Sequence, residues 1–387
     1  MANLAAILEQ VHAIGRNVIA PHAQAVDRDA RFPVEAFDAL KAEKLLSCYV
    51  PEVHGGLGLS VSEVTAICEA IANYCGSTAM IFAMHQIQVA CIVHHCLGSP
   101  YFQGFAAEIV EHQLLLASAT TEIGTGGDVR SSVCAISVVG DRFTVEKQAP
   151  VISYGAHADG ILVTCRRAAD AGASDQVHVL VKRAQVVLTP LSGWDTLGFR
   201  GTCSAGFSLK AEGEAAQILP VPYADIHARS MHPFSHSVWS ALWLGIAADA
   251  VAKARAFVRV EARKTVGTLP PSALRLAEVD TVLFTMRAAV AQTVGEYERM
   301  LEADAPGAFE SNFAFAIRVN NLKVTSSQLL IDIVGKAMVI CGISGYRNDS
   351  KDSLARHLRD AYGAALMVNN DRILGQSALM QIVLRRG

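Results

Sequence analysis

A glycine-rich segment, residues 121–128, is the first stretch of the chain with the means to hold a ligand. It reads Thr-Glu-Ile-Gly-Thr-Gly-Gly-Asp. Glycine leaves backbone N–H groups free to face a bound molecule, and the hydroxyl of Thr121 can both donate and accept a hydrogen bond. Gly126 and Gly127 would equally suit a tight turn, so the segment indicates a binding loop only together with other motifs.

Two later segments carry groups of a similar kind. Ser153 follows Val151 and Ile152 in a stretch that ends at Asp159. Arg263 closes a long helical pattern, and its guanidinium offers a fixed fork of donors that suits a diphosphate better than a lysine would. The alternative for Arg263 is a favourable interaction with the dipole at the C-terminus of its helix.

The elements that must position these residues change in kind twice along the chain. Residues 1–115 carry apolar side chains at helical spacing, whereas residues 116–228 contain short β-branched stretches separated by turns. Residues 229–387 return to helical patterns, long enough for a bundle of four helices. We therefore predict an α+β chain with an N-terminal all-α domain, a middle β-barrel domain and a C-terminal α-helical bundle domain, divided at these positions.

Together the segments resemble the acyl-CoA dehydrogenase superfamily over essentially the whole chain. The resemblance rests on TEIGTGGD at 121–128, VISYGAHAD at 151–159, GFRGTCS at 198–204, RKTVG at 263–267 and ICGISGY at 340–346. It implies the same three-part fold and FAD as the cofactor. It also implies α,β-dehydrogenation of an acyl-CoA or other acyl thioester, with electrons passed to an electron-transfer flavoprotein.

The resemblance assigns contacts with the flavin. Ser153 would donate a hydrogen bond to flavin N5, and Arg263 would reach the FAD pyrophosphate of a neighbouring subunit. Gly127 stands where relatives usually have serine, and Val151 where they often have tryptophan. The other cofactor-binding residues that it implies are Ser118, Thr121, Gly126, Ile152, Thr265, Val339, Gly342, Asn370 and Arg372.

The catalytic base of the family is missing. Relatives place a glutamate nine positions after the arginine of an Arg-Asp pair, and this chain has Val368 there; the alternative position on an earlier helix holds Ser237. Removing a proton next to a thioester needs a positioned base of suitable pKa. If residues 359–384 formed one helix, Asp371 would share a face with Val368. Asp371 is therefore the candidate base, with pairing to a local arginine such as Arg372, or a place on a solvated helix face, as the alternative. His236 and His357 are further candidates, with a structural role as the alternative for each.

Three functions remain open. The first is the acyl thioester dehydrogenation that the family implies. The second is a flavin-dependent monooxygenase or oxidase, because oxygen-using relatives on this fold also lack the glutamate. The third is a catalytically silent flavin-binding homologue.

The bulk composition limits the kinds of binding partner that we expect. Hydrophobic residues make up 51% and charged residues 18% of the chain, which favours extensive subunit interfaces; the resemblance suggests a homotetramer. A net charge of −3 with dispersed Lys and Arg argues against nucleic acid. No apolar run reaches the ~18 residues of a membrane span. Nine cysteines without a CxxC pair indicate reduced thiols, no metal site and a cytoplasmic protein.

Overall fold

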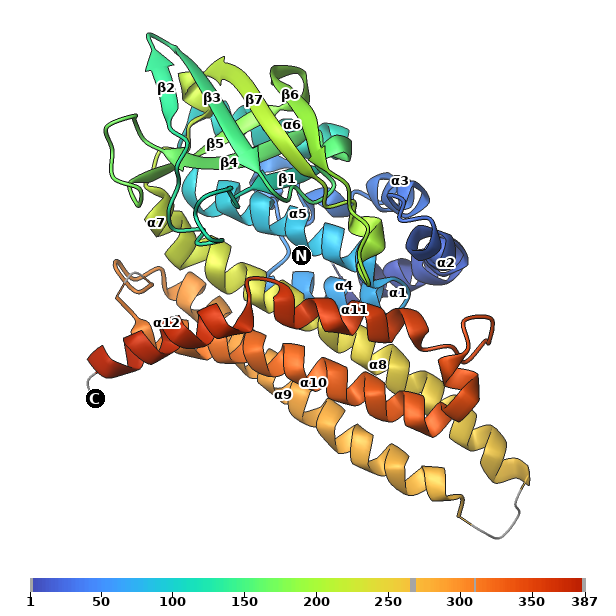
Figure 1. The fold of residues 1–387 in the computed structure, drawn as a ribbon. Coiled ribbons are helices and arrows are strands. Elements are labelled where there is room, and N and C mark those ends of the chain that lie inside the picture. The colour runs from blue at the N-terminus through green and yellow to red at the C-terminus, as the bar shows by residue number, and fades with distance from the viewer. Residues whose placement is uncertain (1–2, 265–268, 310, 385–387) are drawn as a thin grey trace.

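The computed structural model describes residues 3–264, 269–309 and 311–384, which form a helical part, a β part and a second helical part (Figure 1). The first part consists of α1 (Leu4–Ile14), α2 (Ala20–Arg28), α3 (Val34–Ala42), α4 (Val61–Ala72), α5 (Gly76–His95) and α6 (Pro100–His112). In α1, the apolar residues at helical spacing, Ile7, Val11 and Ile14, form the buried face. α5 is buried almost all round and runs through the centre of the molecule.

The β part contains two sheets. In one, β1 (Leu116–Ala119) pairs in parallel with β4 (Gly160–Arg166), which pairs antiparallel with β5 (Gln176–Lys182). In the other, β2 (Ile136–Val139), β3 (Arg142–Ala149), β7 (Gly206–Glu214) and β6 (Val186–Ser192) follow one another antiparallel. The sheets face each other, because the Lys147 ammonium of β3 donates to the Thr164 carbonyl of β4 at 2.6 Å.

The C-terminal part is a bundle. After the short α7 (Tyr223–Ile226), three long helices lie side by side: α8 (His232–Lys264), α9 (Pro271–Ala303) and α10 (Phe313–Tyr346). The fourth position is shared by α11 (Ala355–Leu366) and α12 (Asn370–Val383), which follow each other end to end along the bundle. The three-part architecture predicted from the sequence is therefore confirmed.

The prediction of one continuous helix over residues 359–384 is wrong. The chain leaves the helix at Met367, and Val368 and Asn369 both have a positive φ, of 52° and 42°. A left-handed β-branched residue is uncommon. The sequence has no glycine or proline at these positions. Its helical pattern therefore gave no sign of the break.

Within the part of the chain that the structure describes, two helices are long and apolar enough, by length and composition, to cross a membrane: α5 and α10. In α5, 89% of the most apolar window is buried inside the protein, as expected for a core helix. In α10 the buried share is 39%, and Val339, Ile343 and Tyr346 are exposed. The outer side of α10 therefore presents an apolar surface.

Candidate functional site

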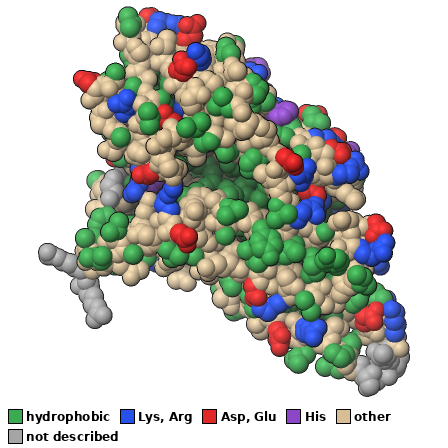
Figure 2. Space-filling model, in the orientation of Figure 1, with side chains coloured by type: hydrophobic (Ala, Val, Ile, Leu, Met, Phe, Trp, Pro, Cys, Tyr) green, Lys and Arg blue, Asp and Glu red, His purple; other side chains and the backbone are tan. Residues whose placement is uncertain are grey.

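A cavity of about 540 Å³ lies where the β part meets helices α5, α8 and α11. Figure 2 shows it as a hollow between the upper and lower parts of the molecule, with hydrophobic side chains in its walls. Met80 and Met84 of α5, Trp239 of α8, and Leu366 and Val368 around the end of α11 supply much of this apolar wall. The cavity is therefore suited to a flat or apolar molecule.

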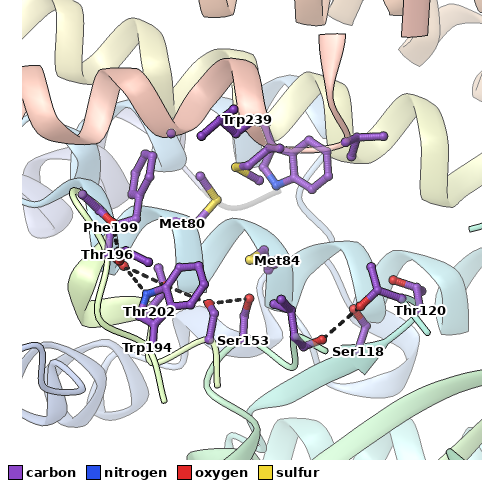
Figure 3. Close-up of a pocket in the computed structure, with 18 of the residues that line it drawn as sticks. Met80, Met84, Ser118, Thr120, Ser153, Trp194, Thr196, Phe199, Thr202 and Trp239 are labelled. Carbon is purple, nitrogen blue, oxygen red and sulfur yellow. Dashed lines mark hydrogen bonds between the residues drawn. The ribbon is translucent and has the colours of Figure 1, made fainter. Parts of the chain in front are cut away.

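The opposite wall, from the β part, carries hydroxyl groups. Ser118 lies at the end of β1, and Thr121 donates to the Val151 carbonyl at 3.2 Å. In Figure 3, Ser153, Thr202 and Trp194 lie on the side of the cavity that faces Trp239. One wall thus offers hydrogen bonds and the other apolar contact.

None of the described residues that line this cavity has a carboxylate or an imidazole. The charged side chain among them is Arg359, whose guanidinium forms an ion pair with Asp27. The positive charge is therefore neutralised before any ligand enters. The cavity has hydroxyls to orient a ligand, and no carboxylate to accept a proton from it.

The turn at 198–204 is held against α11 by a buried carboxylate. Asp360 is 2% exposed and accepts a hydrogen bond from the Phe199 N–H at 2.6 Å. Burial raises the pKa of Asp360 to about 6. A Cβ on Gly198 would lie 2.2 Å from the Arg359 carbonyl oxygen, so this close approach requires glycine. The Gly-Phe-Arg-Gly-Thr motif therefore joins the β part to the C-terminal helices.

The glycine-rich loop is closed by an arginine from the C-terminal bundle. Gly124, Gly126 and Gly127 all have positive φ, and the Arg372 guanidinium donates to the Gly126 carbonyl. A Cβ on Gly127 would lie 2.7 Å from an Arg372 nitrogen. Glycine at position 127 therefore makes room for the Arg372 guanidinium.

A buried ion pair anchors the beginning of the same loop. Glu122 accepts hydrogen bonds from the N–H groups of Val133 and Cys134, at 3.1 and 2.6 Å. The Lys147 ammonium lies 3.7 Å from the Glu122 carboxylate, and both side chains are almost completely buried. Burial lowers the pKa of Lys147. This pair fixes where the loop leaves the β part.

The structure brings several predicted cofactor residues together. Those that line the cavity are Ser118, Thr121, Gly127, Val151 and Ser153. Val368, at the position of the missing glutamate, also lines the cavity. Gly126 lies next to Gly127 in the chain, and the Arg372 guanidinium donates a hydrogen bond to its carbonyl oxygen.

Two predicted cofactor residues do not face the cavity. The Ile152 side chain is fully buried in the core, and its N–H donates to the Ala205 carbonyl at 2.9 Å. Asn370 faces α10, where it accepts a hydrogen bond from the Lys323 ammonium at 2.7 Å and donates to Ser327 at 3.0 Å. Both were predicted to bind the cofactor because of their positions in family motifs. In the structure, the Ile152 side chain packs in the core and the Asn370 side chain hydrogen-bonds to α10.

The residues predicted for the far end of the cofactor lie elsewhere on this chain. Arg263 is exposed in the last turn of α8, 24 positions beyond Trp239, which is about 36 Å along a helix. Val339 is exposed on α10, and Gly342 interrupts that helix with a φ of 56°. Their contact with a neighbouring subunit's cofactor stays a prediction. Thr265 lies outside the described residues.

The structure does not support Asp371 as the base. Asp371 is exposed in the first turn of α12, beyond the break at Val368, and is not among the residues that line the cavity. Ser237 is buried in α8 and donates to the Pro233 carbonyl at 2.8 Å, so it is engaged within its own helix. Arg372 bonds the Gly126 carbonyl, and no ion pair between it and Asp371 occurs among the described residues.

A second cavity of about 270 Å³ adjoins the first, sharing Gly127, Trp239 and Val368 with it. His227, His232 and His236 line it. Burial lowers the pKa of His227 to about 3 and of His232 to about 4, so these rings are neutral near pH 7. No motif in the sequence indicated this cluster; its i, i+4 pair, His232 and His236, was the available signal.

The family models match both helical parts. The acyl-CoA dehydrogenase N-terminal domain matches residues 2–99, and the acyl-CoA dehydrogenase C-terminal domain matches residues 231–367. The chain belongs to the acyl-CoA dehydrogenase family. It is thus a member of a family of flavoprotein oxidoreductases, as the motifs predicted.

Its relatives include dehydrogenases and an oxygenase. The cyclohex-1-ene-1-carbonyl-CoA dehydrogenase of Geobacter metallireducens is 24% identical over 92% of this chain and 91% of its own. FMN-bound TdsC of Paenibacillus sp. A11-2, a dibenzothiophene monooxygenase, superposes with a TM-score of 0.84 at 19% identity over 98% of both chains. Butyryl-CoA dehydrogenase of Megasphaera elsdenii gives 0.83 at 19% identity, over 99% of both. These structures establish the shared fold.

The cavity fits the flavin that the family implies. Its hydroxyl wall offers hydrogen-bonding groups to the heteroatoms of a ring, and its apolar wall offers contact area. The Trp239 indole N–H is buried, and the described residues give it no hydrogen-bond partner. The positive-φ glycines of the loop carry no side chain where backbone N–H groups would face a ligand. Ser118, Thr121, Gly127, Val151 and Ser153 are the residues placed to hold it.

Proposed function

We propose that this protein is a flavin-dependent monooxygenase or oxidase that acts on an apolar substrate. One observation carries the proposal: none of the described residues that line the main cavity has a carboxylate. The dehydrogenation of an acyl thioester needs a base beside the substrate carbon. Val368 occupies the wall where that base would stand, and Asp371 is exposed outside the cavity.

The residues of the cavity have distinct roles in this proposal. A bound flavin supplies the two-electron redox chemistry. Met80, Met84 and Trp239 bind the substrate by apolar contact and exclude water, and methionines adapt to irregular shapes. Ser153 orients the flavin from the opposite wall. The Asp27 carboxylate neutralises Arg359, so the wall carries no net charge and favours an uncharged substrate.

Acyl thioester dehydrogenation with transfer to an electron-transfer flavoprotein is the second candidate. The Geobacter relative, which matches over 92% of this chain, favours it. The deciding experiment mixes the flavin-loaded protein anaerobically with a panel of acyl-CoAs and follows flavin absorbance. Bleaching by an acyl-CoA supports the dehydrogenase. Reduction by a separate flavin reductase, followed by oxygen uptake that depends on an aromatic substrate, supports the monooxygenase. A flavin that neither treatment reduces indicates a non-catalytic homologue.

We propose FAD as the form of the flavin, bound across a subunit boundary. Arg263 and Gly342 lie far from the cavity on this chain, so a second copy must bring them to the dinucleotide half. Arg263→Ala should lower FAD retention during gel filtration and leave FMN retention unchanged. Lys264→Ala, which removes the neighbouring exposed cation, is the control. Equal retention of FAD and FMN by the unmodified protein would instead indicate a mononucleotide enzyme.

A homotetramer is part of the same proposal. The outer side of α10 exposes Val339, Ile343 and Tyr346, and Phe284 of α9 is 73% exposed. Large exposed apolar areas mark interaction sites in soluble proteins. A second copy that covers α10 would bury this area and bring Gly342 toward its partner. Light scattering of the flavin-loaded protein tests the assembly, and Ile343→Lys should shift it toward smaller species.

A further inference from the structure

Three hydroxyl groups form a continuous row that ends at the cavity. The Ser204 hydroxyl donates to the Ser153 hydroxyl at 2.8 Å, and the Thr202 and Ser204 hydroxyls lie 2.8 Å apart. All three side chains are at least nine-tenths buried. They come from two segments, the turn after β3 and the turn before β7, which meet beside the cavity. Figure 3 shows Thr202 and Ser153, the two ends of this row, beside Trp194.

The order of the hydrogens in this row follows from the acceptor at its far end. The Phe199 carbonyl oxygen has three donors within reach: the Thr202 N–H at 3.0 Å, the Thr202 hydroxyl at 2.8 Å and the Trp194 indole N–H at 3.1 Å. A carbonyl oxygen has two lone pairs. The two N–H groups can only donate, whereas the Thr202 hydroxyl has the Ser204 oxygen as a second acceptor. The Thr202 hydrogen therefore points to Ser204.

The remaining hydrogens are then fixed in one direction. Ser204 accepts from Thr202 and gives its single hydrogen to Ser153. Ser153 has already accepted a hydrogen bond inside the protein, so its own hydrogen is left for the cavity. We propose that Trp194, Thr202 and Ser204 are positioning residues that hold Ser153 as a hydrogen-bond donor toward the bound flavin. The proposal rests on the proposed flavin site, with Ser153 against flavin N5.

Removing the Trp194 N–H should reverse the row. The Phe199 oxygen would then have a lone pair for the Thr202 hydroxyl, which already lies at 2.8 Å. Ser204 would turn its hydrogen to Thr202, Ser153 would donate to Ser204, and the Ser153 oxygen would present a lone pair to the cavity. The oxidised flavin accepts a hydrogen bond at N5, whereas the reduced flavin carries a hydrogen there. Reversal therefore favours the reduced form and raises the midpoint potential.

The test is a double-mutant cycle on the midpoint potential of the bound flavin. Trp194→Phe should raise the two-electron potential by about 30 mV, a tenfold change in the equilibrium constant. In a Thr202→Val background the same substitution should have no effect, because the hydroxyl through which Trp194 acts is gone. Thr202→Ser keeps the hydroxyl and should restore the response to Trp194→Phe. Thermal melting of each variant confirms that it is folded.

Thr65→Val is the matched control. Like Thr202, Thr65 is buried and its hydroxyl oxygen lies 2.8 Å from the carbonyl oxygen three residues earlier, but it lies in α4 away from the cavity. It should leave the potential unchanged. The inference is overturned if Trp194→Phe has no effect, or shifts the potential equally in the Thr202→Val background, which would reveal a direct effect of the ring. If the unmodified protein retains no flavin, the proposed function fails instead.

Discussion

Replacing Asp360 by asparagine should remove a pH-dependent loss of stability. Asp360 is 2% exposed, and burial raises its pKa from 3.8 to about 6. Because folding raises the pKa of this acid, its favourable contribution is present below pH 3.8 and is lost as the pH rises to about 6. The lost contribution, at about 1.4 kcal/mol for each pH unit between the two values, is about 3 kcal/mol.

Asparagine keeps an oxygen that can accept the hydrogen bond of the Phe199 N–H, and it never ionises. For 387 residues, with an unfolding entropy of about 2.1 cal/mol/K per residue, 3 kcal/mol corresponds to about 3–4 °C in Tm. About one third of this change falls below pH 4.5, so the Tm of Asp360→Asn minus that of the unmodified protein should rise by about 2–3 °C between pH 4.5 and pH 8. Differential scanning fluorimetry across this range measures it.

Asp371→Asn provides the control for this measurement. Its carboxylate is exposed on α12, so the substitution should leave the pH dependence as it is in the unmodified protein. The argument is refuted if the Tm of Asp360→Asn runs parallel to that of the unmodified protein at every pH. It is also refuted if Asp371→Asn produces the same change.

Three further predictions concern the loop and the missing base. Gly127→Ala places a Cβ against Arg372 and should weaken flavin binding more than Gly126→Ala does. Position 126 also has a positive φ but has open space around it, so Gly126→Ala is the control, and fluorescence titration of the flavin compares the two variants. Glu122→Gln leaves Lys147 buried without a counter-charge and should lower the free energy of unfolding in urea by about 3–5 kcal/mol. Adding Lys147→Met should recover part of this loss. If the losses of the two single variants simply add, the prediction is contradicted. Val368→Glu places a carboxylate in the cavity wall and should introduce anaerobic flavin bleaching by an acyl-CoA, whereas Val368→Gln should not.

The sequence was most informative where a motif and its backbone geometry are inseparable. The glycines of the loop at 121–128 predicted a turn that leaves N–H groups free, and the loop lies beside the cavity with all three glycines at positive φ. Ser153 was predicted from its place in the motif at 151–159 and lines the same cavity. Helical and strand periodicity were sufficient for the three-part fold, because each pattern reports which side of an element is buried.

The errors arose where long-range packing decides the outcome. The break at Val368 has no local signal, so the helical pattern extended across it and placed Asp371 on the same helix face as Val368. Asn370 does not line the cavity of this chain and instead accepts a hydrogen bond from Lys323, 47 positions earlier. The hydroxyl row needed Thr202 and Ser204 beside Ser153, some 50 residues away, and no single motif contains all three.

The left-handed backbone at Val368 also bears on how this protein can change by mutation. A left-handed conformation costs a residue other than glycine about 1–2 kcal/mol, and a β-branched side chain tolerates it poorly. Glycine at this position would relieve the strain but would open the apolar wall of the cavity. Selection for thermal stability alone should therefore find glycine at position 368 readily, and a lineage that keeps valine there is retaining the wall at the expense of stability. Position 368 is thus where selection for stability and selection for the shape of the cavity oppose each other most directly.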